Sequence, residues 1–282
     1  MRILVTGTTG QLGAAVAADL SQDHEVIGVD LVAGPQTTHR GSITDRAFVF
    51  SVTAGVEAVV HTASLHAPHV PDHPRSAFVA VNVQGTVNLL EAAAEHGARR
   101  FVYASTTSLY GRAMEPKDRA VWVTEALTPQ PRDVYDVTKI AAEQFCADVA
   151  RETALSCISL RVSRFFSEPP EKMALYRLYR GVDVRDAAAA HRLALHAEVD
   201  GYEVFNISAR TPFAQDEAEA LLHDAPSVLL RHFPSLDTAF ARRGWTLPAS
   251  IDRVYAIDKA ARRLGYRPRF NFEALMDTSN RR

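Results

Sequence analysis

The stretch Thr6-Gly7-Thr8-Thr9-Gly10-Gln11-Leu12-Gly13 joins an apolar run, Arg2-Ile3-Leu4-Val5-Thr6, to an amphipathic segment at residues 11–20. The apolar run predicts a buried strand and the amphipathic segment predicts a helix. Small residues in such a turn let the backbone bend tightly, approach a pyrophosphate and pack the helix against the strand. Free N–H groups and the positive end of the helix dipole then face the phosphates. The stretch therefore predicts a dinucleotide-binding turn, with contacts from Gly7, Thr9, Gly10, Gln11, Leu12 and Gly13.

The rest of the chain repeats this alternation of apolar runs and longer amphipathic stretches. Further strands are expected at residues 25–30, 58–61, 100–105, 157–161 and 202–207, and long helices at about 74–95 and 135–153. Strands that are apolar throughout, alternating with helices, indicate a parallel sheet covered on both faces. The predicted fold is α/β, a doubly wound parallel sheet of the Rossmann type. We expect a nucleotide-binding domain at residues 1–164, and a segment at 165–282 that completes the sheet and forms a small substrate lobe.

An acidic residue, Asp30, ends the second predicted strand. A carboxylate at this place can accept hydrogen bonds from the adenosine ribose hydroxyls, and it repels a 2′-phosphate. Together with the glycine turn, Asp30 predicts NAD rather than NADP as the cofactor.

Bulk properties exclude several other classes of partner. The chain has 282 residues, 47% of them hydrophobic, and a formal net charge of -2, so nucleic-acid binding is not expected. No apolar run reaches the roughly 18 residues of a membrane span, and the first residues predict a strand rather than a leader peptide. The two cysteines, Cys146 and Cys157, are too few for a disulfide framework. We expect a cytoplasmic protein with a small-molecule substrate and no membrane partner.

A tyrosine and a lysine four residues apart lie in Tyr135-Asp136-Val137-Thr138-Lys139, on one face of a predicted helix. A free tyrosine is a poor base at neutral pH because its pKa is near 10. A neighbouring ammonium favours the phenolate, so the pair can exchange a proton with a substrate hydroxyl. Tyr135 and Lys139 are therefore candidates for the catalytic pair and for contact with the cofactor.

Taken together, these motifs resemble the extended short-chain dehydrogenase/reductases, the NAD-dependent epimerase/dehydratase family. The resemblance rests on the glycine turn, Asp30, Asn82-Val83-Gln84-Gly85-Thr86, Ser105-Thr106 ahead of Tyr110-Gly111, and Tyr135 with Lys139. It implies that Thr106 hydrogen-bonds the reacting oxygen, that Tyr135 is the acid/base and that Lys139 is its partner. It also implies cofactor contacts from Ser42, Ile43, Thr62, Ala63, Ser64, His66, Asn82 and Ser105. Family members dimerise through the two long helices, so the resemblance implies a homodimer.

Three departures from the family pattern narrow the expected reaction. Where related dehydratases carry Thr-Asp-Glu, this chain has Thr106-Thr107-Ser108, so the groups that dehydration needs are missing. Arg164 replaces an asparagine that usually helps to hold a nucleotide diphosphate, and an arginine can bind an anionic group. Val184-Arg185-Asp186 follows Arg161 closely, which shortens the segment that forms the nucleotide-sugar pocket. These features favour a small substrate.

The favoured function is NAD-dependent oxidation or reduction at a secondary hydroxyl or keto group of a small sugar-like or polyhydroxy substrate. The alternatives are a sugar or nucleotide-sugar epimerase, and a non-catalytic NAD-sensing protein on the same fold. His61, His66, His69 and His73 follow the third strand without a ligand set of zinc spacing, so no metal site is expected. Substrate contacts are expected from His66, His69, Thr106, Thr107 and Arg164.

Overall fold

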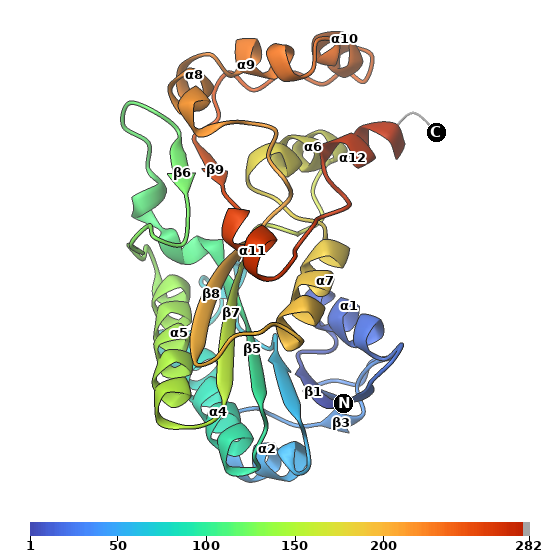
Figure 1. Ribbon diagram of the computed structural model, residues 1–282, viewed down its shortest axis with the longest axis vertical. Helices are drawn as coiled ribbons and strands as arrows, with labels where there is room; N and C mark the ends of the chain where they lie inside the picture. The colour runs from blue at the N-terminus through green and yellow to red at the C-terminus, as the bar shows by residue number, and fades with distance from the viewer. Residues whose placement is uncertain (279–282) are drawn as a thin grey trace.

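A computed structural model describes residues 1–278, and its centre is a seven-stranded sheet with helices on both faces (Figure 1). The strands are β1 (Arg2–Thr6), β2 (Glu25–Asp30), β3 (His39–Arg40), β4 (Ala58–His61), β5 (Arg100–Thr106), β7 (Ser156–Val162) and β8 (Tyr202–Ile207). Their order is β3-β2-β1-β4-β5-β7-β8, and every neighbouring pair is parallel. Strands β2 and β3 are added on one side of β1, and β4 and the later strands on the other side. Ligands bind at this change of strand order in such folds. The predicted doubly wound fold is confirmed.

Two apolar layers cover the sheet because successive strand residues point to opposite faces. Ile3 and Val5 belong to the layer beneath α1 (Gln11–Leu20), α7 (Val184–Leu195) and α11 (Asp258–Arg263). Leu4 lies in the layer beneath α2 (Arg46–Thr53), α4 (Gly85–Glu95) and α5 (Val134–Glu152). In Figure 1 these two sets of helices lie on opposite sides of the strands. The helix expected at about 135–153 is α5, which begins after Asp133, whose side chain accepts from the N–H of Asp136.

The helix expected at about 74–95 is not a regular α-helix along its whole length. It consists of α3 (Arg75–Phe78), a π-helical stretch (Val79–Gln84) and α4. The hydroxyl of Thr86, in the first turn of α4, donates to the carbonyl of Asn82 in the π-helical stretch at 2.7 Å. A π-helical turn widens a helix locally and is frequent near functional sites.

Most of the C-terminal third forms a lobe beyond the carboxyl ends of the strands. The lobe contains α6 (Pro170–Tyr179), α8 (Ala218–His223), α9 (Ala225–His232), α10 (Leu236–Ala241), α12 (Phe272–Thr278) and the parallel pair β6 (Val121–Val123) and β9 (Arg253–Tyr255). Short 3-10 turns occur at Ala67–His69, Thr107–Tyr110, Arg112–Met114 and Gln215–Glu217. The lobe has its own apolar core, to which Leu229 and Phe240 belong. Figure 1 shows α8, α9 and α10 at the end of the molecule farthest from α2.

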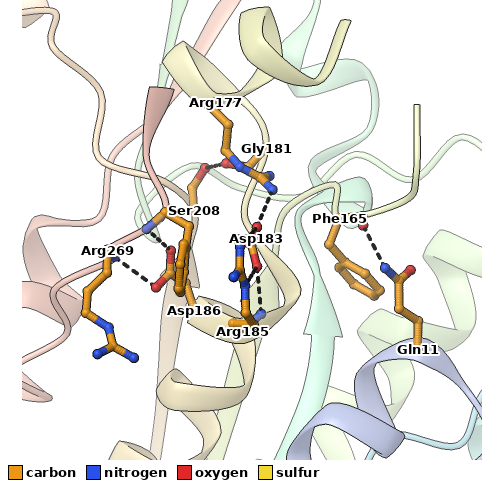
Figure 2. A network of polar contacts seen from close by, with 10 residues as sticks. Gln11, Phe165, Arg177, Gly181, Asp183, Arg185, Asp186, Ser208 and Arg269 are labelled. Carbon is orange, nitrogen blue, oxygen red and sulfur yellow. Dashed lines mark hydrogen bonds and ion pairs between the residues drawn. The ribbon is translucent and has the colours of Figure 1, made fainter. Parts of the chain in front are cut away.

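Polar contacts join the lobe to the sheet around the segment before α7 (Figure 2). The carboxylate of Asp186 accepts from the backbone N–H groups of Arg269 and Phe270, each at 2.9 Å. Arg177 of α6 donates to Asp183 at 3.1 Å, and Asp183 caps α7 by accepting from the N–H of Arg185. Because α7 packs directly on the sheet, these contacts hold the lobe over the strand ends.

No helix among residues 1–278 is long and apolar enough to cross a membrane.

Candidate active site

Two cavities lie at the carboxyl ends of the strands, one on either side of the glycine turn. The larger, of about 360 Å³, reaches toward the lobe, and the smaller, of about 260 Å³, reaches toward β2. Predicted site residues that line the larger cavity are Gly7, Gly10, Gln11, Leu12, Gly13, Thr62, Ser64, His66, Ser105, Thr106, Thr107, Tyr135, Lys139 and Arg164. Those that line the smaller cavity are Gly7, Thr9, Gly10, Asp30, Ser42, Ile43, Thr62, Ala63, Ser64 and His66. Tertiary folding thus brings most of the predicted site together.

The glycine turn has no room for side chains at two of its positions. Gly7 adopts a φ of +76°, and a Cβ there would lie 2.8 Å from the backbone nitrogen of Ala63. A Cβ at Gly13 would lie 2.0 Å from the carbonyl oxygen of Gly7. The first turn of α1 therefore packs directly on the backbone of the loop. The N–H groups of this first helical turn have no partner within the helix and can face a phosphate. This backbone cradle fits the pyrophosphate of NAD.

Asp30 is bound to the backbone of the glycine turn. Its carboxylate accepts from the backbone N–H of Thr9 at 2.9 Å and from that of Val32 at 3.3 Å. The residue lies at the end of β2 and lines the smaller cavity, where the adenosine half of a dinucleotide would lie. Asp30 therefore supports the glycine turn and also forms part of the wall of the smaller cavity.

The three predicted catalytic residues come from two elements. Thr106 ends β5, whereas Tyr135 and Lys139 lie one turn apart on α5, and all three line the larger cavity. The ammonium of Lys139 donates to the carbonyl of Ala104 at 2.7 Å and lies 4.2 Å from the centre of the Tyr103 ring. Two hydroxyls and an ammonium thus face the cavity that the glycine turn also lines.

The electrostatics of this group differ from the sequence-based expectation. Burial raises the pKa of Tyr135 well above its usual range, and the nearby hydroxyl of Thr106 opposes the shift. Lys139 donates to the carbonyl of Ala104 rather than to the phenol of Tyr135. Burial lowers the pKa of Lys139 itself to about 7, and the nearby Glu143 carboxylate opposes that shift.

Asn82 and His69, which we expected to contact ligand, line neither cavity. The buried amide of Asn82 accepts from the N–H of Leu65 at 2.8 Å and donates to its carbonyl at 3.0 Å. The same amide donates to the hydroxyl of Thr138 on α5 at 3.1 Å. Asn82 therefore ties the cofactor-side loop to the helix that carries Tyr135 and Lys139. His69 accepts from the N–H of His66 at 3.0 Å and so helps to position that residue, which lines both cavities.

Histidine rings that follow β4 pack against one another and against Tyr135. The ring centre of His66 lies 5.5 Å from that of His69 and 6.3 Å from that of Tyr135. Burial, followed by the charge of Lys139, lowers the pKa of His66 to about 4, so its ring is neutral at pH 7. In the part of the chain that the structure describes, no cluster of three or more histidine, cysteine or acidic side chains is placed to hold a metal ion.

Several residues of the larger cavity were not predicted from the sequence. Arg132 precedes α5, Arg253 and Tyr255 lie on β9, and Met114 follows β5. The aromatic and basic segment after β7 adds Phe165, Phe166 and Arg180. Only this last segment carried a signal, since aromatic and basic residues are concentrated in it. β9 reaches the site because it pairs with β6, more than a hundred residues earlier, which no local pattern reveals.

Comparison with known proteins agrees with this geometry. Residues 3–180 match the NAD dependent epimerase/dehydratase family. A 3-beta-hydroxysteroid dehydrogenase of Mycolicibacterium neoaurum is 31% identical over 61% of this chain and 50% of its own length. An uncharacterized UDP-glucose epimerase, YtcB, of Bacillus subtilis is 30% identical over 64% of this chain and 62% of its own length. The chain thus spans between half and two thirds of these relatives.

A solved structure shares the fold over the entire chain. A short-chain dehydrogenase/reductase superfamily protein from Agrobacterium tumefaciens, with bound NAD, superimposes with a TM-score of 0.71 at 24% identity, covering 100% of this chain and 97% of the other. At that identity the likeness concerns the fold. Because the family match spans more than half of the residues and includes the glycine turn, Asp30, Thr106, Tyr135 and Lys139, the chain belongs to the NAD dependent epimerase/dehydratase family.

Proposed function

We propose that the protein is an NAD-dependent oxidoreductase that acts on a secondary hydroxyl or keto group of a small sugar-like or polyhydroxy molecule. The observation that carries this proposal is the convergence of Thr106, Tyr135 and Lys139 on the cavity that the glycine turn also lines. NAD, when bound, supplies the acceptor or donor of the hydride. The protein's own groups supply binding, orientation and the transfer of one proton.

The cavity residues divide these tasks by position. The backbone of Gly7 to Gly13 holds the pyrophosphate, and Asp30 accepts from the adenosine ribose. Ser42 and Ile43 line the adenine side, while Thr62, Ala63, Ser64 and His66 border the passage between the two cavities. Thr107 and Arg164 face the substrate side of the larger cavity. Ser105 donates its hydroxyl to Glu143 at 2.5 Å and supports the end of β5 from beneath.

Tyr135 and Thr106 handle the reacting oxygen. In the oxidation direction, the hydroxyl of Thr106 donates to the substrate oxygen, and Tyr135, in its phenolate form, accepts the proton of the substrate hydroxyl as the carbon gives up a hydride. In the reduction direction, Tyr135 returns that proton. Lys139, on the next turn of α5, can turn from the carbonyl of Ala104 toward the ribose or the phenol, and its charge would then lower the pKa of Tyr135. The burial of Tyr135 excludes water from this transfer.

Turnover with a panel of sugar acids, aldoses, polyols and nucleotide sugars, read as NADH absorbance, tests the proposal. We expect net formation of NADH from a small substrate, and a loss of roughly a hundred- to ten-thousand-fold in kcat for Tyr135→Phe. NAD affinity should be unchanged in that variant, and Tyr202→Phe, on β8 and outside both cavities, is the matched control. Full activity of Tyr135→Phe would overturn the mechanism.

The same experiment separates the two other readings of the site. Epimerisation, which the likeness to a UDP-glucose epimerase supports, would change the sugar without net NADH. A sensor would bind NAD without turnover, although the intact Thr106, Tyr135 and Lys139 set favours an enzyme.

We also propose that the protein acts as a homodimer in the cytoplasm. Val137 and Phe145, eight residues apart on one face of α5, and Val79 on the neighbouring helix are 51%, 38% and 50% exposed. Such a face suits a second copy of the chain. The thiols of Cys146 and Cys157 are free and buried, which supports a reducing compartment. A single-chain mass by light scattering would contradict the dimer.

A further inference from the structure

The charge of the larger cavity is unbalanced. Among the described residues its lining includes no aspartate or glutamate, whereas five basic side chains face it: Arg132, Lys139, Arg164, Arg180 and Arg253. Like charges gathered around a space of about 360 Å³ raise the local concentration of anions and repel cations. Four of the five are arginines, which bind carboxylates and phosphates through paired N–H groups. The positive charge of the cavity therefore favours an anionic ligand that binds beside the reacting end of the cofactor.

Three of these arginines already have a carboxylate partner next to them. Arg132 lies 3.4 Å from Asp136, and Arg164 and Arg253 pair with Glu168 and Asp252. Arg180 differs, because no carboxylate among the side chains described for residues 1–276 lies within ion-pairing distance of it. Its positive charge remains available to a ligand.

Aromatic packing holds the side chain of Arg180. The guanidinium carbon lies 4.6 Å from the ring centre of Tyr176 and 5.9 Å from that of Tyr179. Stacking on an aromatic face keeps a guanidinium in place without neutralising its charge. The group is thus oriented before a ligand arrives.

The backbone around Arg180 is also fixed. The N–H of Arg164 donates to the carbonyl of Arg180 at 3.4 Å, and the N–H of Val182 donates to the carbonyl of Arg164 at 2.9 Å. On the other side, the carbonyl of Gly181 accepts from the hydroxyl of Ser208 at 3.2 Å (Figure 2). Arg180 is held between the continuations of β7 and β8, and it does not lie on a free loop.

This position places Arg180 on the same cavity as the reacting hydroxyls. Val162, the last residue of β7, pairs with Thr106 of β5. Arg164, the backbone neighbour of Arg180, follows Val162 by two residues, which is about 7 Å of extended chain. The backbone that carries Arg180 therefore lies within a few residues of the strand end that pairs with Thr106, and both residues line the same cavity. The glycine turn, which holds the cofactor's phosphates, lies at the other side of the same cavity.

We propose that Arg180 binds a carboxylate or phosphate at one end of a small hydroxylated substrate whose reacting carbon lies at Thr106 and Tyr135. The inference rests on the proposed function for the identity of the reacting end. The anion site itself is a matter of binding and can be tested without turnover.

The test measures binding of ligand pairs to the NAD-loaded protein by calorimetry. Each sugar acid and each sugar phosphate is compared with its neutral parent, for example glucuronate and glucose phosphate with glucose, and UDP-glucose is a separate arm. We expect at least one anion to bind at least 10-fold more tightly than its parent. Arg180→Gln should remove this preference, a loss of about 10- to 100-fold for a charged hydrogen bond. Arg180→Lys should restore part of it.

The controls distinguish the ways in which the proposal can fail. Arg262→Gln, an exposed arginine on α11, should leave the preference intact. Equal weakening of the anion and its parent by Arg180→Gln would give Arg180 a structural role, and weaker NAD binding would assign it to the cofactor. Preference for UDP-glucose alone would overturn the small-substrate assignment. An Arg180-dependent preference without NADH formation would uphold the anion site while refuting the proposed oxidoreductase.

Discussion

Glu143 and Arg161 form a buried ion pair directly beneath the proposed catalytic residues. Nη2 of Arg161 lies 2.7 Å from Oε2 of Glu143, and its Nε donates to Oε1 at 3.0 Å. Glu143 follows Lys139 by one turn of α5 and accepts from Ser105, the neighbour of Thr106. The pair thus connects β5, β7 and α5, the three elements on which the candidate site is built.

Replacing one member of this pair should strongly destabilise the protein. Glu143→Gln leaves the guanidinium of Arg161 buried without a counter-charge, which costs about 3–5 kcal/mol. Urea unfolding at neutral pH measures the free energy. The matched control is Glu91→Gln, which breaks the exposed Arg46–Glu91 pair and should cost less than about 1 kcal/mol. Similar losses in the two variants would show that burial of the Glu143–Arg161 pair does not matter.

Acid should destabilise the protein through its buried histidines. Burial lowers the pKa of His61 to about 3, and those of His66 and His191 to about 4. In the unfolded chain a histidine has a pKa near 6.5. Between about pH 6.5 and 4 the unfolded chain therefore binds protons that the folded chain does not, and stability falls as the pH falls. Each histidine contributes a slope of about 1.4 kcal/mol per pH unit in that window.

Urea midpoints measured between pH 4.5 and pH 7 check this dependence. His191→Gln should remove one histidine's share of the slope, whereas His39→Gln, at an exposed residue, should leave the slope as it is. A slope that survives His191→Gln unchanged would place the acid sensitivity in other groups.

Cofactor selectivity should depend on Asp30 in two separable ways. Asp30→Ala removes both the acceptor beside the ribose and the support of the Thr9 N–H, so NAD affinity should fall by about 10- to 100-fold and the preference over NADP should narrow. Asp30→Asn keeps an acceptor for Thr9 but loses the negative charge. It should relax selectivity with a smaller loss of NAD affinity. Titration of both cofactors by fluorescence gives the ratios, and an unchanged ratio in Asp30→Ala would refute the assignment.

Local sequence predicted those parts of the molecule that depend on neighbouring residues. The run from Arg2 to Gly13 specifies strand, turn and helix because its apolar spacing and glycines act over a few residues, and Cβ atoms at Gly7 and Gly13 would collide with backbone. The tyrosine and lysine of α5 could likewise be paired from helix geometry alone. The role of Asn82 was harder to infer, since its partners Leu65 and Thr138 lie on two other elements.

The glycine turn, Asp30 and the α5 pair were thus determined by the sequence itself, and with them the doubly wound fold and the family. Tertiary structure alone decided the charge of the larger cavity. Arg180 and Arg253 come from distant segments, and only folding brings both to one cavity, where Arg253 pairs with Asp252 and Arg180 has no carboxylate partner among the side chains described for residues 1–276. The physical reason is that backbone conformation follows from local sterics and periodicity, whereas an electrostatic site depends on which charges are left uncompensated when remote segments meet.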